Sequence, residues 1–472
     1  MPASKRQRTS SNHVLELLRT YESRNVTFVE PDGSWPIVWE RAKGVHVWDA
    51  DGRKYLDLTA AFGVAAAGHA NPRVVKAGQR QMARLLHAMG DVHPHAVKAQ
   101  LARELSRITF ERWTAPNRKS QIANRKSQIP NRQPQIANPQ SAKTIFCNSG
   151  FEAVEAALKT ALLATGKRDV IAFTGAYHGL GYGALNATHR DFFRSPFRLQ
   201  LAAFSHFAPF PVAAITIDQN IQPKESGSWE IEQSIRSLFG RHSVGAILVE
   251  PVQGRGGIRI PPLSFLPLLR KLCDEHGALL ILDEIYTGLG RTGRWFGCEH
   301  SATVPDLICL GKALAGGFPI SACVGKAELM DAAWPASQGE ALHTSTFLGH
   351  PVGCAMALAQ IAEIEKQKLV QRSARLGKHL LDALSTIQAP RRTHQVFTRG
   401  LGLMAGLEFR SPDGAPATTA VLKIVKAMLR RGFILLPEGE RANVISFTPP
   451  LVITERQLDG ALDALMEVLG DL

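Results

Sequence analysis

The sequence predicts an α/β protein: a large, mainly parallel sheet with helices on both faces, plus a smaller α+β domain. Two observations predict it. First, short and fully apolar runs alternate with helical patterns through the middle of the chain, which is typical of strands buried on both faces. The expected strands of this sheet are residues 144–147, 170–173, 246–249, 278–282 and 307–310. Second, 472 residues with 45% hydrophobic and 20% charged side chains suffice for a core in two or more lobes.

The remaining elements flank this region. Residues 39–58 read as hairpin strands around an Asp51-Gly52 turn, and residues 265–276 as a helix of the large domain. The last part predicts a strand at 402–409, a helix at 418–431, a strand at 444–447 and a final helix after Thr454, which opens with a capping box. We therefore expect an N-terminal tail and helix (1–25), a segment joining the small domain (26–75), the large domain (76–345) and a C-terminal small domain (346–472).

Several classes of protein are excluded at this point. The six cysteines have neither CxxC nor CxxxH spacing, which argues against a structural zinc site and fits reduced thiols in a cytosol. No stretch approaches the roughly 18 apolar residues of a membrane-spanning helix. Residues 1–20 lack the apolar core of a signal peptide, because Glu16 and Arg19 interrupt it. We expect a cytoplasmic protein that does not cross a membrane.

The net charge of +14 is concentrated in two segments. Residues 1–12 and 115–142 carry no acidic residue and together supply +8 of it, from Lys5, Arg6 and Arg8 in the first and Arg118, Lys119, Arg125, Lys126 and Arg132 in the second. The second segment is a repeat (NRKSQIA, NRKSQIP, NRQPQIA) whose prolines forbid a continuous helix. It reads as a disordered surface insertion, so a nucleic-acid partner is not expected.

Residues 148–152 (NSGFE) follow an expected strand and open an expected helix. Ser149 and Glu152 are spaced as a capping box, and the amide groups beside Gly150 lie at the positive end of the helix. Such a helix start binds phosphate well, although many capped helices bind nothing.

Three further features follow apolar strands. Asp283 ends the run ALLILD, where the carboxyl ends of strands gather ligands in open α/β sheets. Lys312 lies among small residues in GKALAGG, and a lysine held away from water becomes a usable amine nucleophile. Tyr177 and His178 precede a glycine and are suited to covering a flat ring, or to packing in the core.

Six motifs, taken in order, resemble those of the class III aminotransferases of pyridoxal phosphate fold type I. They are NSGFEAVEAALK, YHG, EPVQGRGG, LDEIYTGLGRTG, GKALAGGFP and HTSTFLGHP. The resemblance runs from about Pro36 to the C-terminus, apart from the repeat. It implies that Lys312 forms the internal aldimine of pyridoxal 5'-phosphate (PLP), Asp283 pairs with the pyridinium nitrogen, Tyr177 stacks on the ring beside His178, and Ile285 packs on its other face. Ser149, Gly150 and the Phe151 backbone would hold the phosphate. Thr346 would reach the phosphate of the neighbouring subunit in a homodimer.

The implied activity is a ping-pong transamination, in which an amino group moves from an ω-amine or amino acid to an oxo acid. The cofactor supplies the electron sink and the protein supplies geometry. Two alternatives stay open: an epimerase or aminomutase of the same family, and a non-catalytic binding protein that uses the basic repeat. Retention of both Lys312 and Asp283 argues against the second.

Three departures from the family pattern concern the substrate. Where many members carry arginine, glutamate and arginine, this chain has Leu180, Arg255 and Ser446. Because arginine grips carboxylates through paired hydrogen bonds, one interpretation is that Arg255 binds a substrate carboxylate, together with Arg441. The other is that Arg255 is a structural ion-pair partner and that the substrate has no carboxylate. Phe151, where the family prefers a small residue, intrudes on the phosphate site.

Two other patterns are set aside. Residues 288–293 (GLGRTG) match the dinucleotide fingerprint GxGxxG, but no amphipathic helix follows them. His69, His87, His93 and His95 are interpreted as ordinary polar or core histidines, and no metal ion is expected.

Overall fold

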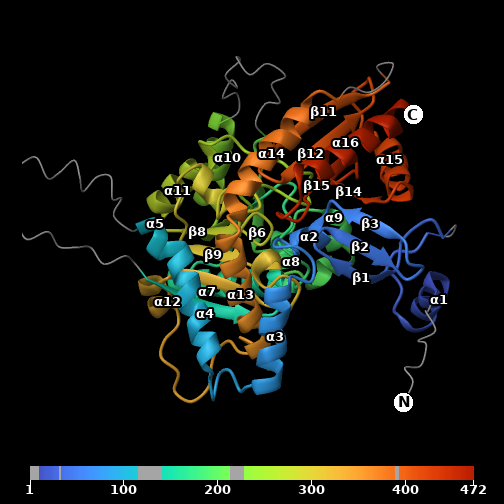
Figure 1. Ribbon diagram of the computed structural model, residues 1–472. Helices are drawn as coiled ribbons and strands as arrows, with labels where there is room; N and C mark the ends of the chain where they lie inside the picture. The colour runs from blue at the N-terminus through green and yellow to red at the C-terminus, as the bar shows by residue number, and fades with distance from the viewer. Residues whose placement is uncertain (1–9, 31–32, 115–140, 213–227, 388–392, 472) are drawn as a thin grey trace, which may run out of the picture.

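The computed structural model describes residues 10–30, 33–114, 141–212, 228–387 and 393–471 (Figure 1). The basic tail at 1–9 and nearly all of the repeat, residues 115–140, lie outside the described residues. Among those that are described, no helix is both long and apolar enough to cross a membrane.

A seven-stranded sheet forms the centre of the molecule, in the order β4-β10-β9-β8-β7-β5-β6. Its strands are β4 (Ala142–Cys147), β5 (Asp169–Phe173), β6 (Ser205–Ala208), β7 (Val244–Val249), β8 (Leu279–Asp283), β9 (Leu307–Leu310) and β10 (Ser321–Lys326). Strands β6, β5, β7, β8 and β9 run parallel, whereas β10 runs antiparallel to both of its neighbours. The mainly parallel sheet is confirmed, with one reversed strand that the apolar pattern does not reveal.

The central strands are buried on both faces, which is why β7, β8 and β9 are almost wholly apolar. On one face Val170, Ala246 and Ile281 pack with the helices α7 (Gly150–Thr165), α8 (Tyr182–Ala187) and α12 (Ala327–Ala333). On the other, Ile171, Ile247 and Leu280 pack in one core with α4 (Ala96–Ser106), α10 (Ser228–Arg241) and α11 (Phe265–His276). Successive residues of each strand thus enter different layers of core.

Two smaller sheets lie beside the large one (Figure 1). The strands β1 (Trp39–Lys43), β2 (His46–Asp49) and β3 (Lys54–Asp57) form the predicted hairpins, and β13 (Phe433–Ile434) pairs parallel with β3. The second sheet has the order β11-β12-β15-β14, formed by β11 (Gln395–Leu401), β12 (Met404–Arg410), β15 (Val444–Phe447) and β14 (Leu436–Glu438). The helices α15 (Thr418–Arg430) and α16 (Glu455–Gly470) lie with it, and Thr454 caps α16 as expected.

The other helices connect these layers. They are α1 (Ser11–Tyr21), α2 (Ala60–Gly63), α3 (Pro72–Arg84), α5 (Arg112–Thr114), α9 (Asp191–Arg194), α13 (Pro351–Lys366) and α14 (Leu369–Ser385). Short 3-10 or π segments complete the described elements: η1 (Arg107–Glu111), η3 (Ser195–Gln200), η4 (Gly297–His300) and η5 (Lys312–Leu314). After residues 288–293 the chain forms turns and the short 3-10 segment η4, so no α-helix directly follows the dinucleotide fingerprint.

One edge of the large sheet collects the segments that carry the predicted site. The carboxyl ends of β5, β7, β8 and β9 meet there because these strands are parallel. Strand β4 is reversed twice relative to β9, through β10, so its end at Cys147 and the start of α7 lie at the same edge. This is where open α/β sheets bind ligands.

Candidate active site

The start of α7 has the features of an anion-binding site. Glu152 accepts hydrogen bonds from the backbone N–H groups of Asn148 (2.6 Å) and Ser149 (3.2 Å), which fixes the turn into the helix. The Ser149 hydroxyl is buried and has no hydrogen-bond partner in the structure. A buried hydroxyl without a partner, beside the amide groups of a first helical turn, fits a phosphate.

Ile285 packs against both this helix start and the segment that carries the lysine. A Cβ atom on Gly150 would lie 3.0 Å from two Ile285 carbons, and one on Gly311 would lie 3.3 Å from the same side chain. Two glycines therefore allow the backbone to approach Ile285 closely on both sides. The predicted neighbours of a flat ring, Ile285 and the residues of the phosphate site, are together in space.

Asp283 is buried at the end of β8 and is held by a specific partner. Its Oδ2 lies 2.8 Å from Nδ1 of the fully buried His178, and its Oδ1 accepts the backbone N–H of Ile285 at 3.1 Å. The backbone N–H of His178 donates to the Thr188 hydroxyl at 2.9 Å, which fixes the histidine in turn. His178 therefore orients the carboxylate that sequence analysis assigned to the ring nitrogen.

Lys312 is partly buried and lies over an aromatic ring. Its Nζ is 4.5 Å from the centre of the Tyr286 ring, and its backbone φ of +22° is a conformation that side-chain-bearing residues seldom adopt. Desolvation lowers the pKa of Lys312, while the negative charges of Asp283, Glu250 and Glu438 act in the opposite direction. A lysine whose ammonium form is disfavoured supplies a free amine, the form that attacks an aldehyde.

Tyr286 itself is held tightly beneath the lysine. A Cβ on Gly63 or Gly254 would lie 2.6 or 2.4 Å from its ring, so only glycine fits at either position. Its hydroxyl lies 3.1 Å from the Thr448 hydroxyl, which links the site to the small domain.

Glu250 ties Tyr177 to the loop that follows β7. Its carboxylate accepts the backbone N–H groups of Tyr177 and Gly254, each at 3.0 Å. Burial raises the pKa of Glu250 to about 7. The Tyr177 ring packs edge-on against Phe193, with centroids 5.6 Å apart.

Arg255 lies at the mouth of the site and has an acidic partner. One guanidinium nitrogen is 3.5 Å from Oε2 of the buried Glu438, and its central carbon is 5.7 Å from the centre of the Tyr177 ring. The other Glu438 oxygen is buried without a hydrogen-bond partner, and burial raises the pKa of this carboxyl group. Glu438 comes from β14, so the small domain supplies the counter-charge.

The other substrate candidates are more scattered. Ser446 is buried in β15 and donates to the Leu436 carbonyl at 3.4 Å. Leu180 is 47% exposed, and Arg441 is exposed in the turn before β15. The structure therefore brings Arg255 next to Tyr177 but gives Arg441 no contact with that pair.

Phe151 and Thr346 lie on the surface of the single chain. Phe151 covers the loop after Tyr177, where a Cβ on Gly179 would lie 2.3 Å from it, and it is 37% exposed. Thr346 is exposed in the segment between α12 and α13.

Taken together, an amine-bearing lysine, a buried carboxylate and an anion-binding helix start share one edge of an α/β sheet. This defines the class: an enzyme that holds a phosphorylated aldehyde cofactor, and the orphaned Ser149 hydroxyl and the Gly150 approach to Ile285 fit PLP. When bound, PLP supplies the electron sink that stabilises a carbanion on the substrate carbon.

Comparison with known proteins identifies the family. The family model for class-III aminotransferases matches residues 28–469, so the chain belongs to that family and is a PLP-dependent transaminase. It is 37% identical to the 5-aminovalerate aminotransferase DavT of Pseudomonas aeruginosa, over 93% of this chain and 94% of that one. It is 35% identical to a putrescine aminotransferase of Pectobacterium atrosepticum, over 94% of this chain and 85% of that one.

The fold agrees with solved structures of the same kind. The ornithine aminotransferase of Toxoplasma gondii, described with partial occupancy of PLP at its active site, superposes with a TM-score of 0.79 at 26% identity, covering 98% of this chain and 95% of that one. The expected fold type I architecture and the PLP dependence are thereby confirmed.

Three residues of the site were not anticipated from the sequence. Glu250 lies in the quoted motif EPVQGRGG, and its position directly after a buried strand was an available signal. Tyr286 had a similar signal, because it lies in the quoted motif LDEIYTGLGRTG three residues after the end of β8. Glu438 had none, because contact between distant segments places it.

Proposed function

We propose that this transaminase takes its amino group from a substrate that carries a terminal amine and a carboxylate, an ω-amino acid, and passes it to an oxo acid. Lys312 is the residue that binds the cofactor's aldehyde carbon and moves the proton, and Asp283, held by His178, pairs with the ring nitrogen. Ser149, Gly150 and the Phe151 backbone hold the phosphate, while Tyr177 and Ile285 cover the ring.

The observation that carries the substrate proposal is the charge of the pocket beside Tyr177. Its lining includes Arg190, Arg255 and Arg259 against a single acid, Glu440. Arginine forks match carboxylates, so this pocket favours an anionic substrate end. The names of the two relatives point the same way in part, since 5-aminovalerate is an ω-amino acid and putrescine is a terminal diamine.

The Arg255–Glu438 pair reconciles the two interpretations of Arg255. At 3.5 Å the pair is loose, and the arginine side chain is 36% exposed while the glutamate is buried. A partly exposed arginine in a loose pair has the freedom to turn towards an incoming carboxylate. Glu438 then holds Arg255 in place when the pocket contains no carboxylate.

Arg255→Gln tests this proposal. Losing one charge-assisted interaction of about 1.5–3 kcal/mol raises the KM for 5-aminovalerate by roughly 10- to 100-fold. Pentylamine, which lacks the carboxylate, is the matched substrate and keeps its kcat/KM within about twofold. Cofactor colour loss in the donor half-reaction and its return with an oxo acid follow the two steps. Equal losses for both amines would contradict carboxylate binding by Arg255.

The same proposal includes a cytoplasmic homodimer in which Thr346 completes the neighbouring site. Exposed apolar side chains adjoin this threonine: Phe347 is 55% exposed and packs on His87, beside Leu86 and Met89, which are 60% and 56% exposed. A second copy would cover this patch. Light scattering should give twice the chain mass, and Thr346→Ala should weaken PLP binding without dissociating the dimer. A monomeric wild-type protein would refute the homodimer. A Thr346→Ala variant that binds PLP as tightly as wild type would refute the role of Thr346.

A further inference from the structure

Two histidines and an aspartate meet at the edge of the large sheet opposite to Lys312. Asp169 is the first residue of β5, His206 is the second residue of β6, and His242 lies just before β7. The register places His206 beside Ile171, on the same face as Asp169. The backbone N–H of Asp169 donates to the Ser243 carbonyl at 3.0 Å, which brings His242 to the same place.

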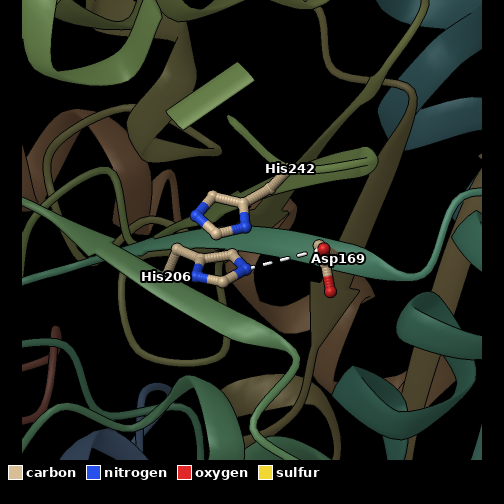
Figure 2. Close-up of side chains that lie close together, drawn as sticks. All are labelled: Asp169, His206 and His242. Carbon is tan, nitrogen blue, oxygen red and sulfur yellow. Dashed lines mark ion pairs between the residues drawn. The ribbon is translucent and has the colours of Figure 1, made fainter. Parts of the chain in front are cut away.

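Figure 2 shows His206 facing Asp169 and the His242 ring lying over the His206 ring. His206 Nε2 lies 3.6 Å from an Asp169 oxygen, and one donor atom from each residue lies within 4.8 Å of the others. The two imidazoles stack, with centroids 3.6 Å apart and planes inclined by 18°. His206 Nε2 is itself buried and has no hydrogen-bond partner.

We propose that Asp169, His206 and His242 bind one divalent transition-metal ion of the zinc type, with water as the fourth ligand. Zinc binds imidazole nitrogen and carboxylate oxygen at about 2.0–2.2 Å, so two ligands of a tetrahedral ion lie about 3.3–3.5 Å apart. The 3.6 Å separation already matches this value, whereas the stacked His242 ring has to turn out of the stack before its nitrogen faces the same ion. Two nitrogens and one oxygen favour Zn²⁺ over Mg²⁺ or Ca²⁺, which prefer oxygen ligands.

The surroundings fit this use of the histidines. Burial and the neighbouring His242 lower the pKa of His206, and the neutral imidazole is the form that binds a metal. Side-chain exposures of 21% for His206 and 17% for Asp169 leave an ion and its water a path to the site. The expectation of no metal ion rested on the cysteine spacing and on His69, His87, His93 and His95; Asp169, His206 and His242 share no short spacing pattern that would reveal them.

The position of the site implies stabilisation rather than catalysis. Strand β6 is an edge strand that pairs only with β5 among the described strands. An ion held by all three residues would tie this edge strand to β5 and to the start of β7. The site lies at the amino ends of these strands and the cofactor residues at the carboxyl ends, so transamination should not require the metal.

Zinc binding to the full-length, PLP-loaded protein tests the site. The protein is treated with a chelator, exchanged into metal-free buffer without amino acids, and titrated with ZnCl₂ in a calorimeter. We expect one Zn²⁺ per chain and at least tenfold weaker binding in Asp169→Asn, His206→Ala and His242→Ala. We also expect a Zn²⁺-dependent rise in Tm in wild type that these three variants lack.

His379→Ala is the matched control. His379 lies 2.6 Å from Asp459 on the surface, so it is a histidine–aspartate pair without a second histidine. This variant should bind Zn²⁺ as wild type does. Absence of stoichiometric binding, or equal binding in wild type and Asp169→Asn, would overturn the proposal. Asp169→Asn keeps the side-chain shape, so it decides the matter should either alanine variant fail to fold.

Discussion

Replacing His178 with leucine should slow the enzyme by loosening Asp283. The histidine lies 2.8 Å from one Asp283 oxygen, and the other oxygen accepts only a backbone N–H at 3.1 Å. A hydrogen bond to a charged group contributes about 1.5–3 kcal/mol, and each 1.36 kcal/mol corresponds to a factor of ten in rate. We therefore expect kcat to fall about 10- to 100-fold, with KM changed far less.

The assay combines steady-state kinetics, normalised to bound PLP, with the visible spectrum of the cofactor. His178→Gln retains a side-chain N–H and should recover part of the lost kcat. His69→Leu is the control, because His69 forms a similar buried pair with Asp57 at 2.7 Å, outside the set of cofactor residues. It should lose stability but keep kcat. Unchanged kcat in His178→Leu, or an equal loss in His69→Leu, would refute the positioning role.

Two further changes follow from the site. The pKa of Glu250 is raised from an ordinary value near 4.5 to about 7, so its stabilising protonation is complete below pH 4.5 and is lost as the pH rises through 7. In wild type this loss lowers the unfolding free energy by up to about 3 kcal/mol between pH 5 and 8. Glu250→Gln has no such carboxyl group, so its Tm should fall less over the same pH range. A Tm that falls as steeply as in wild type would contradict the raised pKa of Glu250. Gly150→Ala places a Cβ 3.0 Å from Ile285 and should weaken PLP binding while costing about 1–3 kcal/mol of stability, whereas Gly460→Ala, with open space around it on α16, should be neutral or stabilising. Fluorescence titration measures the PLP affinity and thermal unfolding measures the stability. Equal PLP affinity and equal stability of Gly150→Ala and Gly460→Ala would show that contact with Ile285 is irrelevant.

The architecture was largely predictable from local pattern. Residues 170–173 and 307–310 are apolar throughout because both faces of the sheet are covered, and the strands β5 and β9 occupy those positions. Thr454 and Gln457 form the expected capping box, because capping depends only on neighbours in the sequence. Strand β10 was missed, since SACVGK has no strong periodicity and gains its strand conformation by pairing with β4 and β9.

The sequence indicated candidate residues for the site but not the contacts between them. Lys312 and Asp283 stood out because each follows an apolar strand, and the charge of Asp283 does act on Lys312. The His178–Asp283 hydrogen bond and the Arg255–Glu438 pair join residues far apart in the sequence, so no spacing rule reveals them. The predicted domain boundaries remain predictions.

The pairing of β3 with β13 affects how this chain is made. Leu56 lies opposite Phe433, and Asp57 opposite Ile434, so one small sheet contains residues that are far apart in the sequence. On the ribosome, β1 to β3 emerge before β13 and must wait for their last strand until residues 58–432 have been synthesised. Contacts of such long sequence separation form slowly. A C-terminal truncation before residue 433 would therefore expose the edge of an N-terminal sheet, and aggregation of the nascent chain is the expected result.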